Sequence, residues 1–256
     1  MGAVQTPQPI DRIAPTLQPD AHALMLQSWH HLLFLHWEVP AAELQALLPP
    51  GLDLDTYEGK AYIGLIPFTM TGVRPVGVPA VPGLSSFHEI NVRTYVHRNG
   101  KDPGVWFFSL DASSVLAVTA ARAAYHLPYF NASMELEATK EPLPTVDFRT
   151  HRDDARGPMP ANAHIRYRPI EGPVQESVPN TIEHFLIERY ILYSADEAKD
   201  LYRARLHHQP YPVQKAEVLE LEETLIWSAG VKRPQQPTLR HYAKGVDVHI
   251  YGLEKV

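Results

Sequence analysis

The chain has 256 residues, 45% of them hydrophobic and 20% charged, which is the composition of a globular domain with a sizeable core. The net charge of −6 argues against nucleic acid as a partner, and the absence of cysteine excludes disulfides and thiolate metal sites. No apolar run reaches the roughly 18–20 residues that span a bilayer, and no secretory pattern opens the chain, so we expect a cytoplasmic protein without membrane contact.

In chain order, residues 1–22 lack periodicity and are predicted to form a flexible arm before a single domain over residues 23–256. The apolar stretch 29–39 predicts a buried strand. Residues 41–48 predict a helix that begins after Pro40 and stops at Pro49-Pro50-Gly51. Two strands are expected within residues 52–70, around a turn at Glu58-Gly59. The Gly- and Pro-rich segment 71–86 predicts a long loop, which is often functional or mobile.

Residues 87–96 and 105–111 predict strands joined by a turn at 97–104, and Ser113 or Ser114 would cap an Ala-rich helix through residue 123. A polar loop is expected at 152–160, and residues 181–193 combine a short helix with a strand. Residues 196–206 are ambiguous. Further strand patterns occur at 129–138, 145–150, 164–168, 216–226 and 246–251. Many short strands, few helices and 24 prolines predict a β-rich α+β fold.

The strand at residues 87–96 is the most informative segment. Because successive side chains of a strand face opposite ways, its polar residues share one face opposite an apolar face. These residues are Glu89, Asn91, Arg93 and Tyr95. Either this face meets water, or it lines an enclosed cleft that binds a small polar ligand. The next strand, residues 105–111, is almost wholly apolar and therefore expected to be buried, which supports the enclosed alternative.

Several motifs resemble the acetoacetate decarboxylase superfamily, and more closely its uncharacterised YqjF-like branch. They are Glu-Ile-Asn-Val-Arg-Thr-Tyr-Val from Glu89, Gly-Val-Trp-Phe-Phe-Ser-Leu-Asp from Gly104, Ala-Arg-Ala-Ala-Tyr-His-Leu-Pro-Tyr from Ala121, Glu-Arg-Tyr from Glu188 and Gly-Val-Asp-Val from Gly245. The resemblance runs from about residue 29 to the C-terminus. It implies one domain on a bent antiparallel sheet that closes into a cone or barrel, with a few helices outside and a pocket inside.

The lysine on which decarboxylase chemistry depends is missing. In the decarboxylases two lysines follow the proline of the Leu-Pro step, and the first forms a Schiff base with the substrate ketone after the second lowers its pKa. Here Tyr129 and Phe130 follow Pro128, so imine chemistry is excluded at this position. Another lysine could substitute, and Lys215 and Lys244 are the candidates that lie near strand starts.

The resemblance places the family's motif glutamate on Glu89, its N-terminal arginine on His30 and its helix arginine on Arg122. The candidate catalytic residues are Glu89 and Tyr129. The candidate substrate-binding residues are His30, Asn91, Arg93, Tyr95 and Arg122. Arg189 either belongs to an ion pair, the preferred interpretation, or reaches the pocket as an anion clamp.

Two functions stay open at this point. In the first, the protein is a lyase or hydrolase for a small oxygenated, anionic molecule, with an arginine on a carboxylate, Glu89 as acid or base and Tyr129 at an oxyanion. In the second, it is a non-catalytic small-molecule-binding protein. A structural role for the polar strand is a third alternative. Decarboxylase relatives form oligomers, so a homo-oligomer is compatible with the resemblance.

No cofactor is predicted. The chain has 14 histidines, but His30 and His31 are adjacent on a strand and would face opposite ways, and no His-Glu-x-x-His spacing occurs. No metal site is therefore expected, although His30 and His208 are the histidines to inspect first.

Overall fold

The structure, a computed structural model, describes residues 10–140 and 143–256. Its strands are β1 (Met25–Val39), β2 (Asp53–Leu54), β3 (Ala61–Pro75), β4 (Phe87–Arg98), β5 (Lys101–Ala112), β6 (Tyr129–Ala138), β7 (Val146–Arg152), β8 (Asn162–Pro169), β9 (Ile191–Ala195), β10 (Leu201–His208), β11 (Val213–Glu223) and β12 (Leu239–Lys255). Its helices are α1 (Ala41–Ala46), α2 (Val115–Tyr125), α3 (Ile182–Ile187) and α4 (Leu225–Ser228), with a 3₁₀ turn η1 (Ala14–Thr16).

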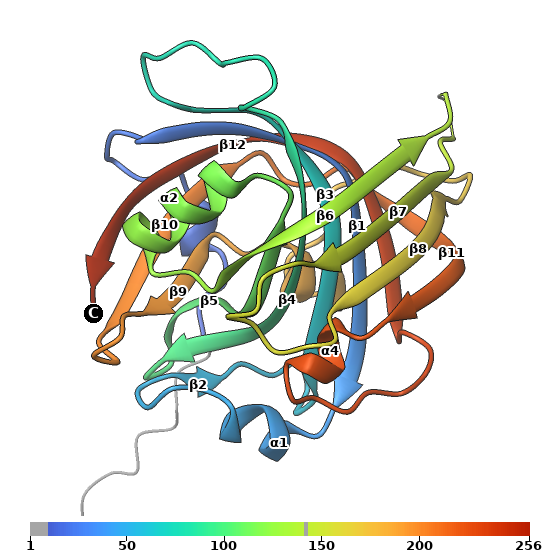
Figure 1. The fold of residues 1–256 in the computed structure, drawn as a ribbon. Helices are drawn as coiled ribbons and strands as arrows, with labels where there is room; N and C mark the ends of the chain where they lie inside the picture. The colour runs from blue at the N-terminus through green and yellow to red at the C-terminus, as the bar shows by residue number, and fades with distance from the viewer. Residues whose placement is uncertain (1–9, 141–142) are drawn as a thin grey trace, which may run out of the picture.

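The strands curve around a closed circuit of hydrogen-bonded neighbours (Figure 1). The circuit runs from β1 through β3, β4, β5, β9, β10 and β12 back to β1, and every pair is antiparallel except β5 with β9. A second layer of β6, β7, β8 and β11 joins the same sheet at β5 and β12. The predicted β-rich α+β fold, with a strongly bent sheet and few helices, is confirmed.

β1, β3 and β4 form a wall that is packed with apolar side chains on both faces. On β1, Leu32 and Phe34 belong to a first core, which also takes side chains from α2, β9 and β10. The alternate residues Leu33 and Leu35 belong to a second core, shared with β7 and β8. Burial of both faces removes a large apolar area from water, which is the main stabilising contribution available to this wall.

β4 keeps the alternation that its sequence predicts. Ile90 and Val92 lie in the second core, whereas the polar residues that alternate with them lie on the side of the first. That polar face does not meet water, because Glu89, Asn91 and Arg93 are only 1%, 5% and 9% exposed. The alternative in which this strand is an ordinary water-facing edge is therefore wrong.

Irregularities in β1 and β3 reverse the direction of their side chains part of the way along. His31 has a φ of 54°, and Gly72 has a φ of 62°, each beside a register shift between the two strands. An extra residue in a strand switches the alternation of the side chains that follow it. As a result, Trp29 and Leu32 of β1, and Met70 and Val73 of β3, all turn toward the first core.

The turn between β4 and β5 is tighter than the predicted span of residues 97–104. Asn99 and Gly100 take φ values of 51° and 76°, and Arg98 pairs directly with Lys101. An Asn-Gly pair tolerates positive φ at both central positions, so a two-residue turn closes and the ladder continues to its end.

The turn at Glu58-Gly59 forms as predicted, with Tyr57 paired to Lys60. A strand lies on each side of it, as predicted, but the two strands do not pair with each other as a hairpin. Before the turn only β2 is a strand, and it pairs with β4 rather than with β3. After the turn, β3 runs on to Pro75, so the predicted loop at 71–86 begins only at residue 76.

α2 begins where Ser114 caps it. The Ser114 hydroxyl accepts a hydrogen bond from the Ala117 N–H at 3.3 Å, which satisfies one of the donors that the first turn leaves free. Ser114→Ala is expected to lower the free energy of unfolding by about 1 kcal/mol. Chemical denaturation followed by circular dichroism measures this, and Ser86→Ala, at an exposed position outside the helix, is the control. Equal losses in the two variants would contradict the assignment.

An ion pair is buried where β5 and β7 approach each other. Arg152 and Asp111 are 1% and 0% exposed, and Arg152 donates from Nε and Nη2 to both carboxylate oxygens over 2.7–3.1 Å. Its Nη1 donates to the Pro158 carbonyl at 2.8 Å, and its guanidinium lies 4.4 Å from the Phe130 ring centroid. A Cβ added at Gly157 would come within 2.8 Å of Arg152 Nη1 and 2.9 Å of the Phe130 ring, so a larger residue there would displace these side chains.

Residues 1–9 of the predicted arm lie outside the described residues. From Ile10 onward the arm contacts the domain: Arg12 pairs with Asp55, and Arg205 donates to the carbonyls of Pro15 and Leu17. Across the described ranges, no helix combines the length and apolarity required to cross a membrane.

Candidate functional site

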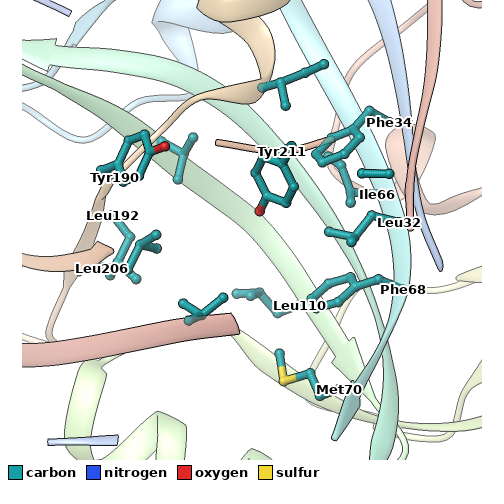
Figure 2. Packing of buried hydrophobic residues seen from close by; sticks show 14 of the residues in the cluster. Leu32, Phe34, Ile66, Phe68, Met70, Leu110, Tyr190, Leu192, Leu206 and Tyr211 are labelled. Atoms are coloured by element: carbon teal, nitrogen blue, oxygen red, sulfur yellow. The ribbon is translucent and has the colours of Figure 1, made fainter. Parts of the chain in front are cut away.

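A cavity of about 500 Å³ lies in the first core, enclosed by β1, β3 and β4 on one side and by β9, β10 and α2 on the other. Most of its lining is apolar. In Figure 2, Leu32, Phe34, Ile66 and Phe68 face Leu192 and Leu206 across a common space, and the hydroxyl of Tyr211 points into it. A cavity of this size, mostly apolar with few polar groups, is typical of small-molecule sites.

Two sets of polar residues contribute to this lining. The deep set comes mainly from β4 and β6 and consists of Glu89, Asn91, Arg93, Tyr129, Arg189 and Tyr211. The outer set lies near the ends of β1 and β3 and the start of β4, and consists of Gln27, Arg74 and Ser85. The structure thus brings four of the predicted site residues together, namely Glu89, Asn91, Arg93 and Tyr129.

Glu89 is the carboxyl group of the deep set. Its Oε2 accepts a hydrogen bond from the Tyr129 hydroxyl at 2.6 Å, and its Oε1 accepts a long one from Asn91 Nδ2 at 3.4 Å. Burial raises the pKa of Glu89 to about 7, although both hydrogen bonds oppose the shift. Burial and the neighbouring carboxylate raise the pKa of Tyr129 well above its usual value. Near neutral pH, Glu89 therefore exists in both protonation states, beside a tyrosine that keeps its proton.

Arg93 is the cation of the deep set. It donates from Nη2 to the Leu186 carbonyl at 2.9 Å, and its guanidinium carbon lies 5.8 Å from the Phe34 ring centroid. Its Nε has no hydrogen-bond partner, and among the described residues no carboxylate forms an ion pair with it. A buried guanidinium without a counter-charge is costly, so this part of the cavity favours an anion.

Arg189 also lines the cavity, but unlike Arg93 it has a carboxylate partner, Asp55, which it shares with Arg12. Its Nη1 donates to Asp55 at 2.8 Å, and its Nε donates to the Phe185 carbonyl at 2.7 Å. Arg189 therefore belongs to an ion pair, with Asp55 as its partner. The neighbouring Glu188 instead accepts from the Tyr190 hydroxyl and from the Tyr211 N–H.

Three predicted site residues lie outside the cavity lining. His30 shares a hydrogen bond of 2.9 Å with Thr71. Tyr95 bonds to His36 and donates to the Leu186 carbonyl, the same oxygen that Arg93 contacts. Arg122 donates to the Tyr129 carbonyl at 2.9 Å. Each is linked to a residue that lines the cavity. His30 follows Trp29 in the chain, and Arg122 bonds to the backbone of Tyr129. Tyr95 shares the Leu186 carbonyl with Arg93.

Aromatic residues that the motifs did not single out also form the lining. Trp29 and Tyr211 both line the cavity and both contact the ring of His208. Burial lowers the pKa of His208 to about 4, so this histidine is neutral at pH 7. Tyr211 lies between two prolines in a segment without periodicity, and no local signal in the sequence marks it as a pocket residue.

No lysine lines the cavity, although all eight lysines lie within the described residues. Lys215 and Lys244, the candidates to replace the missing nucleophile, are exposed. Over residues 10–140 and 143–256, no three His, Asp or Glu side chains are grouped so that they could hold a metal ion.

Solved structures share this fold at low sequence identity. An acetoacetate decarboxylase-like enzyme from Sphingomonas wittichii RW1 aligns with 92% of this chain and 94% of its own, at 12% identity and a TM-score of 0.62. The enduracididine biosynthesis enzyme MppR, complexed with the condensation product of pyruvate and imidazole 4-carboxaldehyde, aligns with 92% of this chain and 90% of its own, at 10% identity and a TM-score of 0.61. Acetoacetate decarboxylase from Legionella pneumophila aligns with 100% of this chain and 98% of its own, at 13% identity and a TM-score of 0.58. The architecture is thus acetoacetate decarboxylase-like.

The chain belongs to the DUF2071 family, described as an uncharacterised conserved protein, whose model matches residues 26–247. A curated relative is the uncharacterised protein YqjF of Bacillus subtilis (strain 168). It is 40% identical over 237 residues, which cover 93% of this chain and 94% of YqjF. The resemblance predicted from the sequence motifs is confirmed.

Proposed function

We propose that this protein binds a small organic anion in the cavity and transfers protons on it through Glu89 and Tyr129. The observation that carries the proposal is a carboxyl group buried to 1% exposure, with a pKa near 7, on the same strand face as an uncompensated arginine. A general acid or base works best when its pKa lies near the working pH. Glu89 meets that condition.

Arg93 would hold the anionic group, because a guanidinium can donate two parallel hydrogen bonds to a carboxylate. Two polar atoms support this assignment, since Arg93 Nε and Asn91 Oδ1 are buried without protein partners and could bond to a ligand. MppR, which has the same fold, is also found complexed with pyruvate, a small keto acid. That likeness supports an organic acid as the ligand class.

The remaining predicted residues would orient the residues that line the cavity without lining it themselves. Arg122 would fix the backbone of Tyr129, and Tyr95 would fix the Leu186 carbonyl that orients Arg93. His30 would hold Thr71 next to the irregular part of β3. When Glu89 takes up a proton, the Tyr129 hydroxyl becomes free to donate to an oxygen of the ligand, which suits either a lyase or a hydrolase reaction.

A thermal-shift screen of small keto, hydroxy and simple carboxylic acids tests the binding step. Acids that stabilise the wild type should bind about 10- to 100-fold more weakly to Arg93→Gln, because a charge-assisted pair is lost. Arg74→Gln is the matched control, since Arg74 lies at the outer end of the same cavity. Unchanged affinity in Arg93→Gln would refute the assigned anion site.

NMR of each bound acid over time tests the chemical step. At least one acid should be consumed, and Glu89→Gln should slow its loss by about 10²- to 10⁴-fold while the acid still binds. A second candidate function, non-catalytic binding, is favoured by the absence of a lysine from the described cavity lining. In that case Glu89→Gln would change affinity, and no acid would ever be consumed.

A further inference from the structure

The strand register gives the cavity a direction. Along β4 the lining residues alternate from Phe87 at one end to Arg93 at the other, a distance of roughly 20 Å at about 3.3 Å per residue. On the neighbouring β3, Met70 pairs with Phe87, and Phe68 pairs with Glu89. The acid and the arginine therefore lie at the inner levels, whereas the level of Phe87 and Met70 is apolar.

The outer end of the cavity opens to solvent between the loop after β3 and helix α2. Val81, Leu84 and Leu116 line the cavity and yet are 47%, 55% and 61% exposed, which places them at its mouth. In Figure 1 this loop projects beyond the ends of β3 and β4. Alanines of α2, among them Ala117 and Ala121, line the same end and leave space beside the strands.

The volume is large for a short acid. At about 500 Å³ it falls within the range of roughly 300–1,000 Å³ that is typical of sites for drug-sized ligands. A keto acid of three or four carbons would leave more than half of this space against apolar walls. Burying those walls against a ligand is favourable, at roughly a fourfold gain in affinity for each methylene group.

We propose that the ligand is an amphipathic monocarboxylic acid whose carboxylate binds Arg93 and whose apolar tail runs past Phe87 to the mouth formed by Leu84 and Leu116. This inference rests on the proposed function, because it takes the anion site at Arg93 from it. It adds the class of ligand, an acid with an aliphatic or aryl tail of several carbons, and the direction in which that acid lies.

Calorimetric titration of the full chain with straight-chain acids from four to twelve carbons, below their micelle concentrations, tests the proposal. The dissociation constant should fall about fourfold for each added carbon until the tail reaches the mouth, and then level off. Alcohols of the same length should bind at least tenfold more weakly. Arg93→Gln should remove this preference for the acid, whereas Arg149→Gln, at an exposed position of β7 outside the cavity lining, should keep it.

A variant that fills the tail channel gives the second measurement. Ala121→Phe should shorten the best tail by several carbons and leave the four-carbon acid unaffected. Ala123→Phe, on an exposed part of the same helix that does not line the cavity, should leave the series unchanged. If Ala121→Phe does not fold, the titration of the wild type with acids of increasing length still tests the proposal.

The possible results separate the two proposals. Short acids that bind through Arg93 with an affinity independent of length would overturn the amphipathic ligand and leave the anion site intact. Binding that grows with length but ignores Arg93→Gln would overturn the proposed orientation. If no acid of any length binds, the proposed function itself fails.

Discussion

Glu89→Gln is expected to gain stability over the wild type as the pH rises, by about 2–3 kcal/mol between pH 5 and pH 8. The folded-state pKa of Glu89 is raised from 4.5 to about 7, so the folded protein holds a proton that the unfolded chain releases. Wild-type stability from this group is therefore lost as the pH rises from 4.5 to about 7. Glutamine has the same shape and no charge, so the variant does not show that loss.

Urea unfolding of the two proteins at half-unit pH steps measures the difference. Glu188→Gln should show the same sign, because burial raises the pKa of Glu188 as well. Glu137→Gln, at an exposed position of β6, provides the baseline. A difference between Glu89→Gln and the wild type that stays constant across the range would contradict a raised pKa at Glu89.

Arg152→Met should cost about 3–5 kcal/mol, because it leaves the Asp111 carboxylate buried without its partner. Replacing both residues, as Arg152→Met with Asp111→Leu, should recover much of this loss, since an apolar pair of similar volume needs no compensation. A double-mutant cycle in chemical denaturation measures the coupling between the two side chains.

Arg149→Met is the matched control for that cycle. Arg149 lies on the same strand and pairs with Asp147, but its side chain is 59% exposed, so the loss should stay below about 1 kcal/mol. If Arg152→Met costs no more than Arg149→Met, or if the double replacement is no better than the single one, the buried pair does not have the assigned role.

The local pattern of β4 was enough to predict which side chains share a face, and burial of the next strand indicated that this face is enclosed. The alternating pattern did not predict how far along β4 each polar side chain lies from Glu89. Tyr95 has the same parity as Glu89, but six residues separate them by roughly 20 Å, and Tyr95 packs against Phe185 outside the cavity lining. Alternation assigns a face to a residue without assigning a depth.

The structural features that the sequence analysis did not predict depend on contacts between segments that are distant in the chain. β12 runs from Leu239 to Lys255, but only residues 246–251 were predicted, because the earlier part becomes a strand by pairing with β1 and β11. β10, which was ambiguous in the sequence, becomes a strand between β9 and β12. Tyr211 enters the cavity from a proline-flanked segment whose position is set by neighbours far away in the chain.

The wall formed by β1, β3 and β4 belongs to two cores at once. Ile90 and Val92 carry no chemistry, but each is bonded through the backbone to residues that line the cavity. A change of side-chain volume at either position would shift β4, and with it Glu89 and Arg93, relative to the facing side of the cavity, even though Ile90 and Val92 do not line the cavity. The geometry of the cavity can therefore be altered from the opposite side of the sheet, where substitutions would ordinarily be chosen for stability alone.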